Sequence, residues 1–268
     1  MPEVAMLGFP TDSNSSYLRG SAKAPGYIRA ALWNEGANSF SETGIDLKAD
    51  GILRDFGDVD LAEDEMDRAT IEHAVAAQLD AGRSVLSLGG DHSITYPIVK
   101  AFARRFPDLR IVHFDAHPDL YPIFNGSRYS HACPFARILE DTGVTQLVQI
   151  GIRTMTAVQR EVAQRFGVAV YAPWELDHAR AALPDGPVYV TVDLDGIDPA
   201  FAPGVSHREP GGLSVRDVLE TIKCIPGYLV GADVVELNPD KDVDELTAMV
   251  AAKLAKELVA RKCRKAVP

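Results

Sequence analysis

The sequence predicts an α/β fold, in which a parallel sheet carries helices on both faces within one domain of residues 1–268. Short apolar runs rich in β-branched residues alternate with segments whose apolar residues recur at helical spacing, which favours a parallel sheet. Several runs are apolar at consecutive positions, as is typical of strands buried on both faces. No internal repeat and no Pro-, Gly- or Ser-rich linker divides the chain, so we expect a single domain.

Eight runs are predicted to be strands. They are residues 4–7, 52–56, 84–88, 109–114, 147–150, 168–171, 188–192 and 229–236. Because the carboxyl ends of parallel strands meet at one edge of a sheet, we expect the functional site at that edge.

Three segments have apolar residues at helical spacing and are predicted to be helices: 67–78, 94–105 and 247–262. Pro97 falls in the first turn of the second, where its missing N–H costs little. We expect the third to pack on the sheet, with a subunit contact as the alternative. Residues 11–26, 118–130 and 199–212 are predicted to be irregular and to crowd the carboxyl edge of the sheet.

The composition narrows the classes of partner. The net charge of -11 argues against a nucleic-acid or anionic-membrane surface, because phosphates bind where Lys and Arg cluster. The three cysteines are odd in number and widely spaced, so neither a disulfide framework nor a cysteine zinc site is expected. The sequence shows no leader pattern and no apolar run of membrane-spanning length, which predicts a soluble cytosolic protein.

Acidic and histidine side chains follow three of the predicted strands. Asp115, His117 and Asp119 occupy alternate positions, so period-two geometry points them the same way. Asp193 and Asp195 stand in the same relation at the end of another strand, and a Gly-Gly turn presents Asp91 and His92 after a third. Carboxylates gathered at one sheet edge repel one another, and they need a concentrated positive charge between them.

Two imidazoles and four carboxylates form a thiolate-free ligand set that suits two divalent ions about 3.5–4 Å apart. Because most ligand atoms in this set are carboxylate oxygens, manganese is the favoured metal ion. Iron, cobalt, nickel and zinc bind similar ligands, so availability decides among them. The DLDGID segment does not fit a calcium loop, because its Gly comes too early and no Glu follows at the required distance.

Three motifs resemble the ureohydrolase family of arginases and agmatinases: GGDHS at 89–93, DAHPD at 115–119 and DLDGIDP at 193–199. The resemblance runs from Leu7 to Leu254. It is strongest to plant-type arginases, through segments such as HPDLYPIFNGSRYSHACPFARI and APGVSHREPGGLS. The resemblance implies an arginase-like three-layer sandwich with an eight-stranded parallel sheet, assembled as a trimer or hexamer.

The resemblance also implies roles for individual residues. One manganese ion would be held by His92, Asp115, Asp119 and Asp193, and a second by Asp115, His117, Asp193 and Asp195. His131 matches the family's proton-shuttling histidine, and Glu236 matches the glutamate that receives the guanidinium group. Asp119 would also hold the attacking hydroxide.

The substrate is less sharply defined than the metal chemistry. Thr156 stands where animal-type arginases carry an aspartate that helps bind the α-amino group. Asn125 and Ser130 are candidates for binding the amino-acid end, or for capping their loop. His207 and Arg208 are candidates for the pocket rim.

The function expected is therefore hydrolysis of a small cationic guanidino compound to release urea, with arginine favoured as the substrate. Agmatine follows closely, and a formimino-acid hydrolase would share the metal motifs. A two-metal phosphoesterase is disfavoured, because it usually needs cationic groups for the anionic oxygens of its substrate. A silent protein that only binds metal or a guanidino ligand is the non-enzyme alternative.

Overall fold

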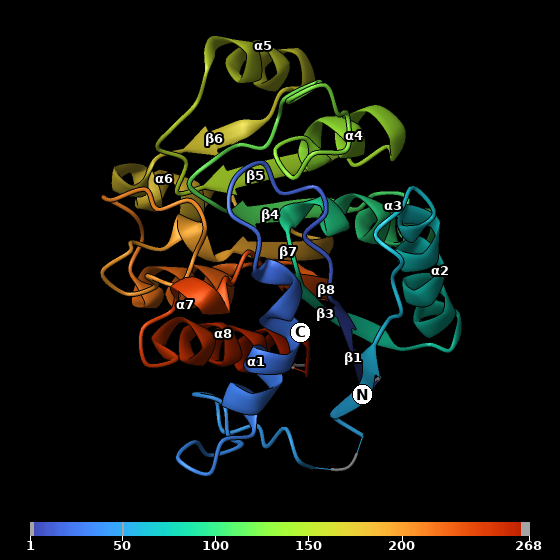
Figure 1. The fold of residues 1–268 in the computed structure, drawn as a ribbon, viewed down its shortest axis with the longest axis vertical. Coiled ribbons are helices and arrows are strands. Elements are labelled where there is room, and N and C mark those ends of the chain that lie inside the picture. Colours follow the sequence, from blue (N-terminus) through green and yellow to red (C-terminus); the bar gives the residue numbers. More distant parts are fainter. Residues whose placement is uncertain (1–2, 50, 264–268) are drawn as a thin grey trace.

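The computed structural model describes residues 3–49 and 51–263. One sheet of parallel strands has the order β2-β1-β3-β8-β7-β4-β5-β6 (Figure 1). The strands are β1 (Val4–Phe9), β2 (Leu53–Asp58), β3 (Ser84–Gly89), β4 (Arg110–Phe114), β5 (Gln146–Ile150), β6 (Ala169–Tyr171), β7 (Pro187–Asp193) and β8 (Tyr228–Val235). The eight predicted strands are confirmed, with bounds that differ by a few residues.

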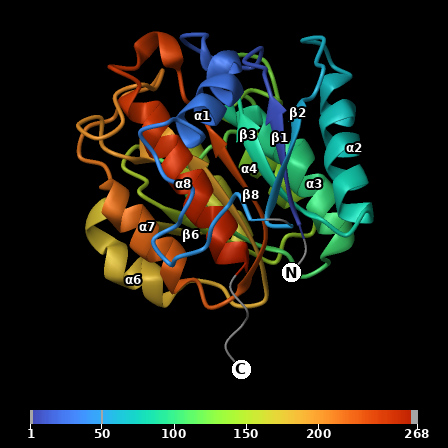
Figure 2. The ribbon, with the colours of Figure 1, turned by 90° about the horizontal axis from the view of Figure 1, so that it is seen from below.

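Helices cover both faces of this sheet, which confirms the predicted three-layer sandwich (Figures 1 and 2). One core layer contains the apolar faces of α1 (Ala24–Leu32), α6 (Leu176–Ala181), α7 (Val215–Cys224) and α8 (Leu246–Cys263). The opposite layer contains those of α2 (Asp67–Asp80), α3 (Thr95–Arg105), α4 (Pro134–Asp141) and α5 (Ala157–Phe166). None of the helices within the described ranges is long and apolar enough to cross a bilayer.

The alternation of side chains along the central strands explains the two layers. In β7, Val188, Val190 and Val192 pack into the layer of α7 and α8, whereas Tyr189 packs into the layer of α3. Each face of the strand is therefore buried, as the consecutive apolar positions predicted.

The irregular segments agree in part with their prediction. Residues 118–130 and 199–212 contain no helix or strand. The prediction that residues 11–26 are irregular is wrong for the C-terminal part of this segment, because a 3₁₀ turn covers Ser21–Lys23 and α1 starts at Ala24. Pro25 lies in the first turn of α1, where its missing N–H has no helical partner to lose.

Candidate metal centre and catalytic cavity

Four neighbouring strands at the centre of the sheet, β3, β8, β7 and β4, place the predicted site residues at one edge. His92 follows β3, Glu236 follows β8, and Asp193 ends β7. The turn after β3 needs a glycine, because a Cβ on Gly90 would lie 1.7 Å from the carbonyl oxygen of Thr11. The close passage of the segment after β1 is the physical reason for Gly90, whereas a Cβ on Gly89 would lie 2.5 Å from the side chain of Val235.

The first cluster surrounds the buried ring of His92. Its Nδ1 lies 3.2 Å from Asp115 Oδ2, 3.1 Å from Asp119 Oδ2 and 3.2 Å from Asp193 Oδ2. This nitrogen is fully covered, yet it has no hydrogen-bond partner within residues 3–49 and 51–263. Ligand atoms around one octahedral ion at roughly 2.1 Å are about 3 Å apart, so the spacing and the orphaned nitrogen fit a divalent cation.

The second cluster surrounds His117. Its Nδ1 lies 3.1 Å from Asp195 Oδ2 and 3.5 Å from Asp115 Oδ1. Asp115 therefore turns one carboxylate oxygen to each cluster. Backbone amides hold other oxygens in place: Ala116 donates to Asp195 Oδ1 at 3.1 Å, and Asp195 donates to Asp193 Oδ1 at 2.8 Å.

The pKa values of Asp119 and Asp193 are raised, whereas the neighbouring histidines lower the pKa of Asp115. Burial and the charge of Asp115 raise the pKa of Asp119 to about 6. Burial and the charge of Asp195 raise the pKa of Asp193 well above its usual range. A divalent cation between these groups favours their ionised forms and removes the cost of gathering them. The donor set thus fits the expected metal ions.

A buried hydrogen-bonded chain lies behind His92. Its Nε2 is 3.0 Å from the hydroxyl of Thr191, and Asp233 lies beyond this hydroxyl. Asp233 Oδ2 also accepts hydrogen bonds from Thr95 Oγ1 at 2.9 Å and Tyr189 OH at 2.8 Å. With Nε2 engaged, the ring of His92 is oriented so that Nδ1 faces the carboxylates.

His113 was missed by the sequence analysis, although it continues the alternate spacing of Asp115, His117 and Asp119. Its ring is fully buried, and Nε2 lies 2.7 Å from Asp115 Oδ2. Burial lowers the pKa of His113 to about 4, so the ring is neutral at pH 7. The ring belongs to a group of residues with the geometry of a metal site, together with His92 and Asp115.

The other ring nitrogen of His113 decides its role. The amide Nε2 of Gln149 lies 3.0 Å from His113 Nδ1 and 2.7 Å from the carbonyl oxygen of Pro118. An amide nitrogen only donates, so Nδ1 accepts and Nε2 carries the proton. His113 therefore donates to Asp115 and has no lone pair left for a metal ion.

Glu236 and His131 form a second functional pair beside the clusters. Glu236 Oε1 accepts from the amide of His92 at 2.9 Å and from His131 Nδ1 at 2.8 Å. The amide of Ser16 donates to His131 Nε2 at 3.1 Å, so Nδ1 carries the ring proton. Burial lowers the pKa of His131, but the charge of Glu236 outweighs it and raises the pKa above its ordinary value.

Two of the described non-glycine residues with a positive φ lie at the same place. Glu236 has φ of 66° and Asp119 has φ of 50°, both in the left-handed region that L-residues rarely adopt. Such conformations cost of the order of 1–3 kcal/mol and persist where the surroundings fix them. Both side chains line the cavity described next, so the strain coincides with the candidate catalytic residues.

These side chains line a cavity of about 190 Å³. Its floor contains Asp119, Asp193, Asp195, His117, His131 and Glu236, and its walls contain Ser16, Tyr121, Phe124, Ala132, Thr154, Thr156, Gln159 and His207. Thr156 and His207, both predicted near the substrate, are in this wall. Gln159 was not predicted, although its place one helical turn after Thr156 is visible in the sequence.

Three other candidates lie outside the cavity wall. Asn125 is exposed in a turn, with φ of 49°. Ser130 is buried, and its hydroxyl accepts a hydrogen bond from the amide of Ala132 at 3.4 Å. The guanidinium group of Arg208 donates to the carbonyl oxygens of Pro203 at 2.8 Å and Lys241 at 2.9 Å.

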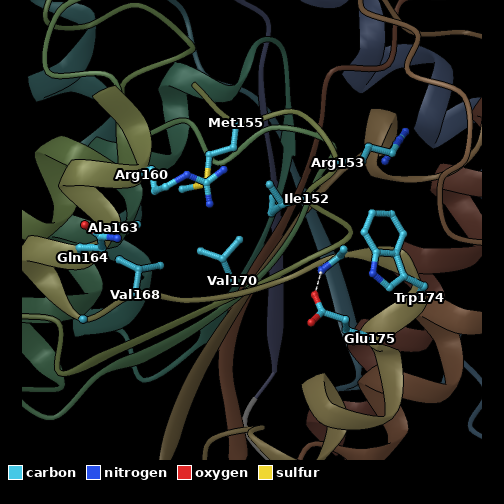
Figure 3. A pocket seen from close by; sticks show the side chains of 12 residues that line it. Ile152, Arg153, Met155, Arg160, Ala163, Gln164, Val168, Val170, Trp174 and Glu175 are labelled. Carbon is cyan, nitrogen blue, oxygen red and sulfur yellow. Dashed lines mark hydrogen bonds between the residues drawn. The ribbon is translucent and has the colours of Figure 1, made fainter. Parts of the chain in front are cut away.

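A larger cavity, of about 670 Å³, is lined in part by the segment after β5 (Figure 3). Arg160, Met155 and Trp174 line it, together with part of α5 and β6. Its lining includes Glu175, whose carboxylate accepts from the amide of Ala172 at 3.0 Å. It brings no cluster of acidic and histidine side chains together, so the smaller cavity is the candidate catalytic site.

Comparison with known proteins agrees with this geometry. A model of the Arginase family matches residues 2–260. Arginase 1, mitochondrial, of Arabidopsis thaliana is 44% identical over 275 residues, which cover 96% of this chain and 80% of the relative. Other plant relatives are also named mitochondrial or chloroplastic. The prediction of a cytosolic protein relied on the absence of a leader pattern, and these names contradict it.

Two solved structures share the whole architecture. Arginase from Medicago truncatula superimposes with a TM-score of 0.91 at 41% identity, covering 97% of this chain and 87% of that one. Agmatine ureohydrolase of Thermoplasma volcanium superimposes with a TM-score of 0.87 at 36% identity, covering 97% and 90%. With a family match along nearly its full length and relatives well above 30% identity, this chain belongs to the arginase family.

Proposed function

We propose that this protein is a dimanganese arginase, which hydrolyses L-arginine to L-ornithine and urea. The observation that carries the proposal is one small cavity that joins both His-carboxylate clusters to Glu236 and His131. Members of the arginase family are metal-dependent hydrolases of linear C–N bonds. When bound, two divalent ions lower the pKa of a water molecule from about 15.7 toward roughly 7 and supply a nucleophile at neutral pH.

Glu236 is placed to orient the guanidinium group. Its Oε1 is occupied by His92 and His131, whereas Oε2 has no partner within the described residues. A carboxylate oxygen that faces the cavity accepts charge-assisted hydrogen bonds from the planar cation and fixes its position. This positioning presents the guanidinium carbon to the attacking water.

Asp119 and His131 handle the protons of the reaction. Asp119 Oδ2 faces His92, and its other oxygen is free within the described residues to accept a hydrogen bond from the attacking water. The water gives one proton to Asp119 as its oxygen bonds to the guanidinium carbon, and Asp119 passes this proton to the substituted nitrogen as the bond between that carbon and that nitrogen breaks. The departing amine takes its second proton from His131, whose raised pKa favours the protonated form at neutral pH, and the hydroxyl proton left on urea returns His131 to that form.

The ligand set supports two metal ions. We propose His92, Asp115, Asp119 and Asp193 for one ion and Asp115, His117, Asp193 and Asp195 for the other, with Asp115 and Asp193 shared. Manganese suits these oxygen-rich ligands, and iron, cobalt, nickel or zinc is the alternative. Measurement of bound metal per chain after growth in mixed metals tests the identity and the count, and a ratio near one would contradict the dinuclear centre.

Agmatinase is the second candidate function. No lysine or arginine lines the cavity within the described part of the chain, so an α-carboxylate finds no cationic side chain there. Comparing urea release from arginine, agmatine and 4-guanidinobutyrate separates these activities. A higher kcat/KM for arginine supports arginase, and a higher value for agmatine supports agmatinase.

We also propose a homo-oligomer, either a trimer or a hexamer. The proposal rests on the membership of the arginase family, and the exposed ring of Trp174, 79% accessible, is a candidate contact between copies. Light scattering on the purified protein tests this proposal, and a monomer at micromolar concentration would contradict it.

A further inference from the structure

We propose that the side-chain amide of Gln159 binds a carboxylate at the end of the substrate opposite the guanidinium group, and so selects guanidino acids over guanidino amines. The inference rests on the proposed function and concerns one wall of the same cavity. Thr156, Gln159 and Thr154 form this wall, where α5 begins.

The orientation of the Gln159 amide is fixed by its neighbours. Thr156 donates to Gln159 Oε1 twice, from its backbone N–H at 3.0 Å and from its hydroxyl at 3.0 Å. A backbone N–H only donates, so the atom that it meets is the oxygen and not the nitrogen. The backbone N–H of Gln159 donates in return to Thr156 Oγ1, and this bond completes a capping box.

This arrangement leaves the amide nitrogen of Gln159 without a partner. The residue is 3% exposed and lines the cavity, yet no oxygen within residues 3–49 and 51–263 accepts a hydrogen bond from Nε2. A donor that lines the cavity and has no protein partner there is free to bind a ligand oxygen. Both N–H groups of Nε2 are therefore available to a substrate acceptor.

The sign of the charge at this wall favours an anion. The wall lies at the N-terminus of α5, where the helix dipole is positive. The carboxylates of the two clusters and Glu236 line the same cavity and repel a substrate carboxylate from their own surroundings. Arginine and 4-guanidinobutyrate carry a carboxylate that Nε2 can bind, whereas the ammonium group of agmatine has no acceptor to offer.

Thr156 and Gln159 have different roles in this wall. Thr156 holds Gln159 through its backbone and its hydroxyl, so its hydroxyl is already used. Thr156 is therefore a positioning residue, and Gln159 makes the contact that determines specificity.

The Gln159→Glu variant is the sharpest test, because glutamate also completes a capping box and keeps the shape of the side chain. It replaces the donor by an acceptor oxygen. We expect kcat/KM for arginine and 4-guanidinobutyrate to fall about 10-fold or more, and kcat/KM for agmatine to stay equal or to rise. Gln164→Ala, on the same helix but in the lining of the larger cavity, is the matched control and should change neither.

Binding of the products gives a readout that does not need turnover. Calorimetry on the manganese-loaded protein compares ornithine, which keeps the carboxylate, with putrescine, which lacks it. We expect Gln159→Glu to weaken ornithine binding about 10-fold and to leave putrescine binding equal or stronger. Equal losses for both amines, or no change for ornithine, would overturn the inference even if the wild type releases urea.

Discussion

His113 Nε2 donates a hydrogen bond to Asp115 Oδ2 across 2.7 Å, and the same oxygen lies 3.2 Å from His92 Nδ1. The neutral ring thus holds the carboxylate that the two clusters share. Its own orientation is fixed by Gln149 on one nitrogen and by stacking on Phe135, with ring centroids 4.0 Å apart. The candidate metal centre therefore depends on side chains that are not among its proposed ligands.

The first prediction concerns this supporting bond. His113→Phe keeps a flat ring against Phe135 but removes the donor to Asp115. We expect manganese affinity to fall roughly 10- to 100-fold, as is typical when a partner of a metal ligand is lost. Calorimetric titration with Mn²⁺ measures the loss. His73→Phe, on the exposed side of α2, is the control, and an unchanged affinity in His113→Phe would contradict the supporting role.

The second prediction concerns the chain behind His92. Thr191→Val removes the hydroxyl between His92 Nε2 and Asp233 while keeping the shape of the side chain. We expect about 10-fold weaker manganese binding, because the ring of His92 loses its orientation. Asp233→Asn should give a similar loss, and the double variant should lose less than the two losses combined, since both act through one chain. Fully additive losses would show that the two residues act separately.

The third prediction separates metal binding from proton transfer. His131→Ala should reduce kcat about 100-fold or more and leave bound manganese nearly unchanged, because its ring contacts Glu236 and Ser16. Asp193→Ala should lose metal and turnover together, because its carboxylate faces His92. Urea release and bound metal are measured on the same samples. Normal urea release by Asp193→Ala would exclude the two-metal mechanism.

The fourth prediction is a pH dependence of stability at Glu42, which does not line the cavity. Glu42 joins α7 to α8 through Arg216 and Lys223 at 2.8 Å and Lys253 at 3.3 Å. Hydrogen bonds from Arg216 and Lys223 hold the pKa of Glu42 well below its ordinary value. A lowered folded-state pKa contributes stability that is present above the unfolded value, near 4.5, and is lost as pH falls below it.

Glu42→Gln should therefore melt below the wild type at pH 7, by roughly 2–4 °C if the network contributes about 1 kcal/mol. The difference should shrink as the pH falls below about 4.5. Thermal melts at several pH values, with the exposed Glu161→Gln on α5 as control, measure it. A difference that stays constant down to pH 2 would exclude the charge of Glu42 as its source.

The sheet could be predicted from the sequence because its central strands have a simple apolar pattern. Strands such as β7 are buried on both faces, which requires consecutive apolar residues. The same alternation that places Asp115, His117 and Asp119 also includes His113, whose role depends on Gln149 from the neighbouring strand. A contact between two strands is not encoded in the spacing of either one, so this support could not be derived from the motif.

The cavity wall formed by Thr154, Thr156 and Gln159 could likewise be predicted only in part from the sequence. Thr156 was identified from its place in the sequence, but the hydrogen bonds that leave Gln159 as the free donor depend on where α5 begins. Asn125 and Ser130 are candidates because they precede His131, yet neither is among the residues that line the cavity. Loop conformation depends on tertiary contacts, which local sequence does not specify.

Urea release by the manganese-loaded protein is the most direct test of the central claim, that the paired clusters and Glu236 form a guanidino hydrolase. The account predicts that arginine yields urea and ornithine in equal amounts, that removal of metal abolishes the activity, and that added manganese restores it. Absence of urea from arginine, agmatine and 4-guanidinobutyrate, in protein shown to hold its metal, would contradict the account.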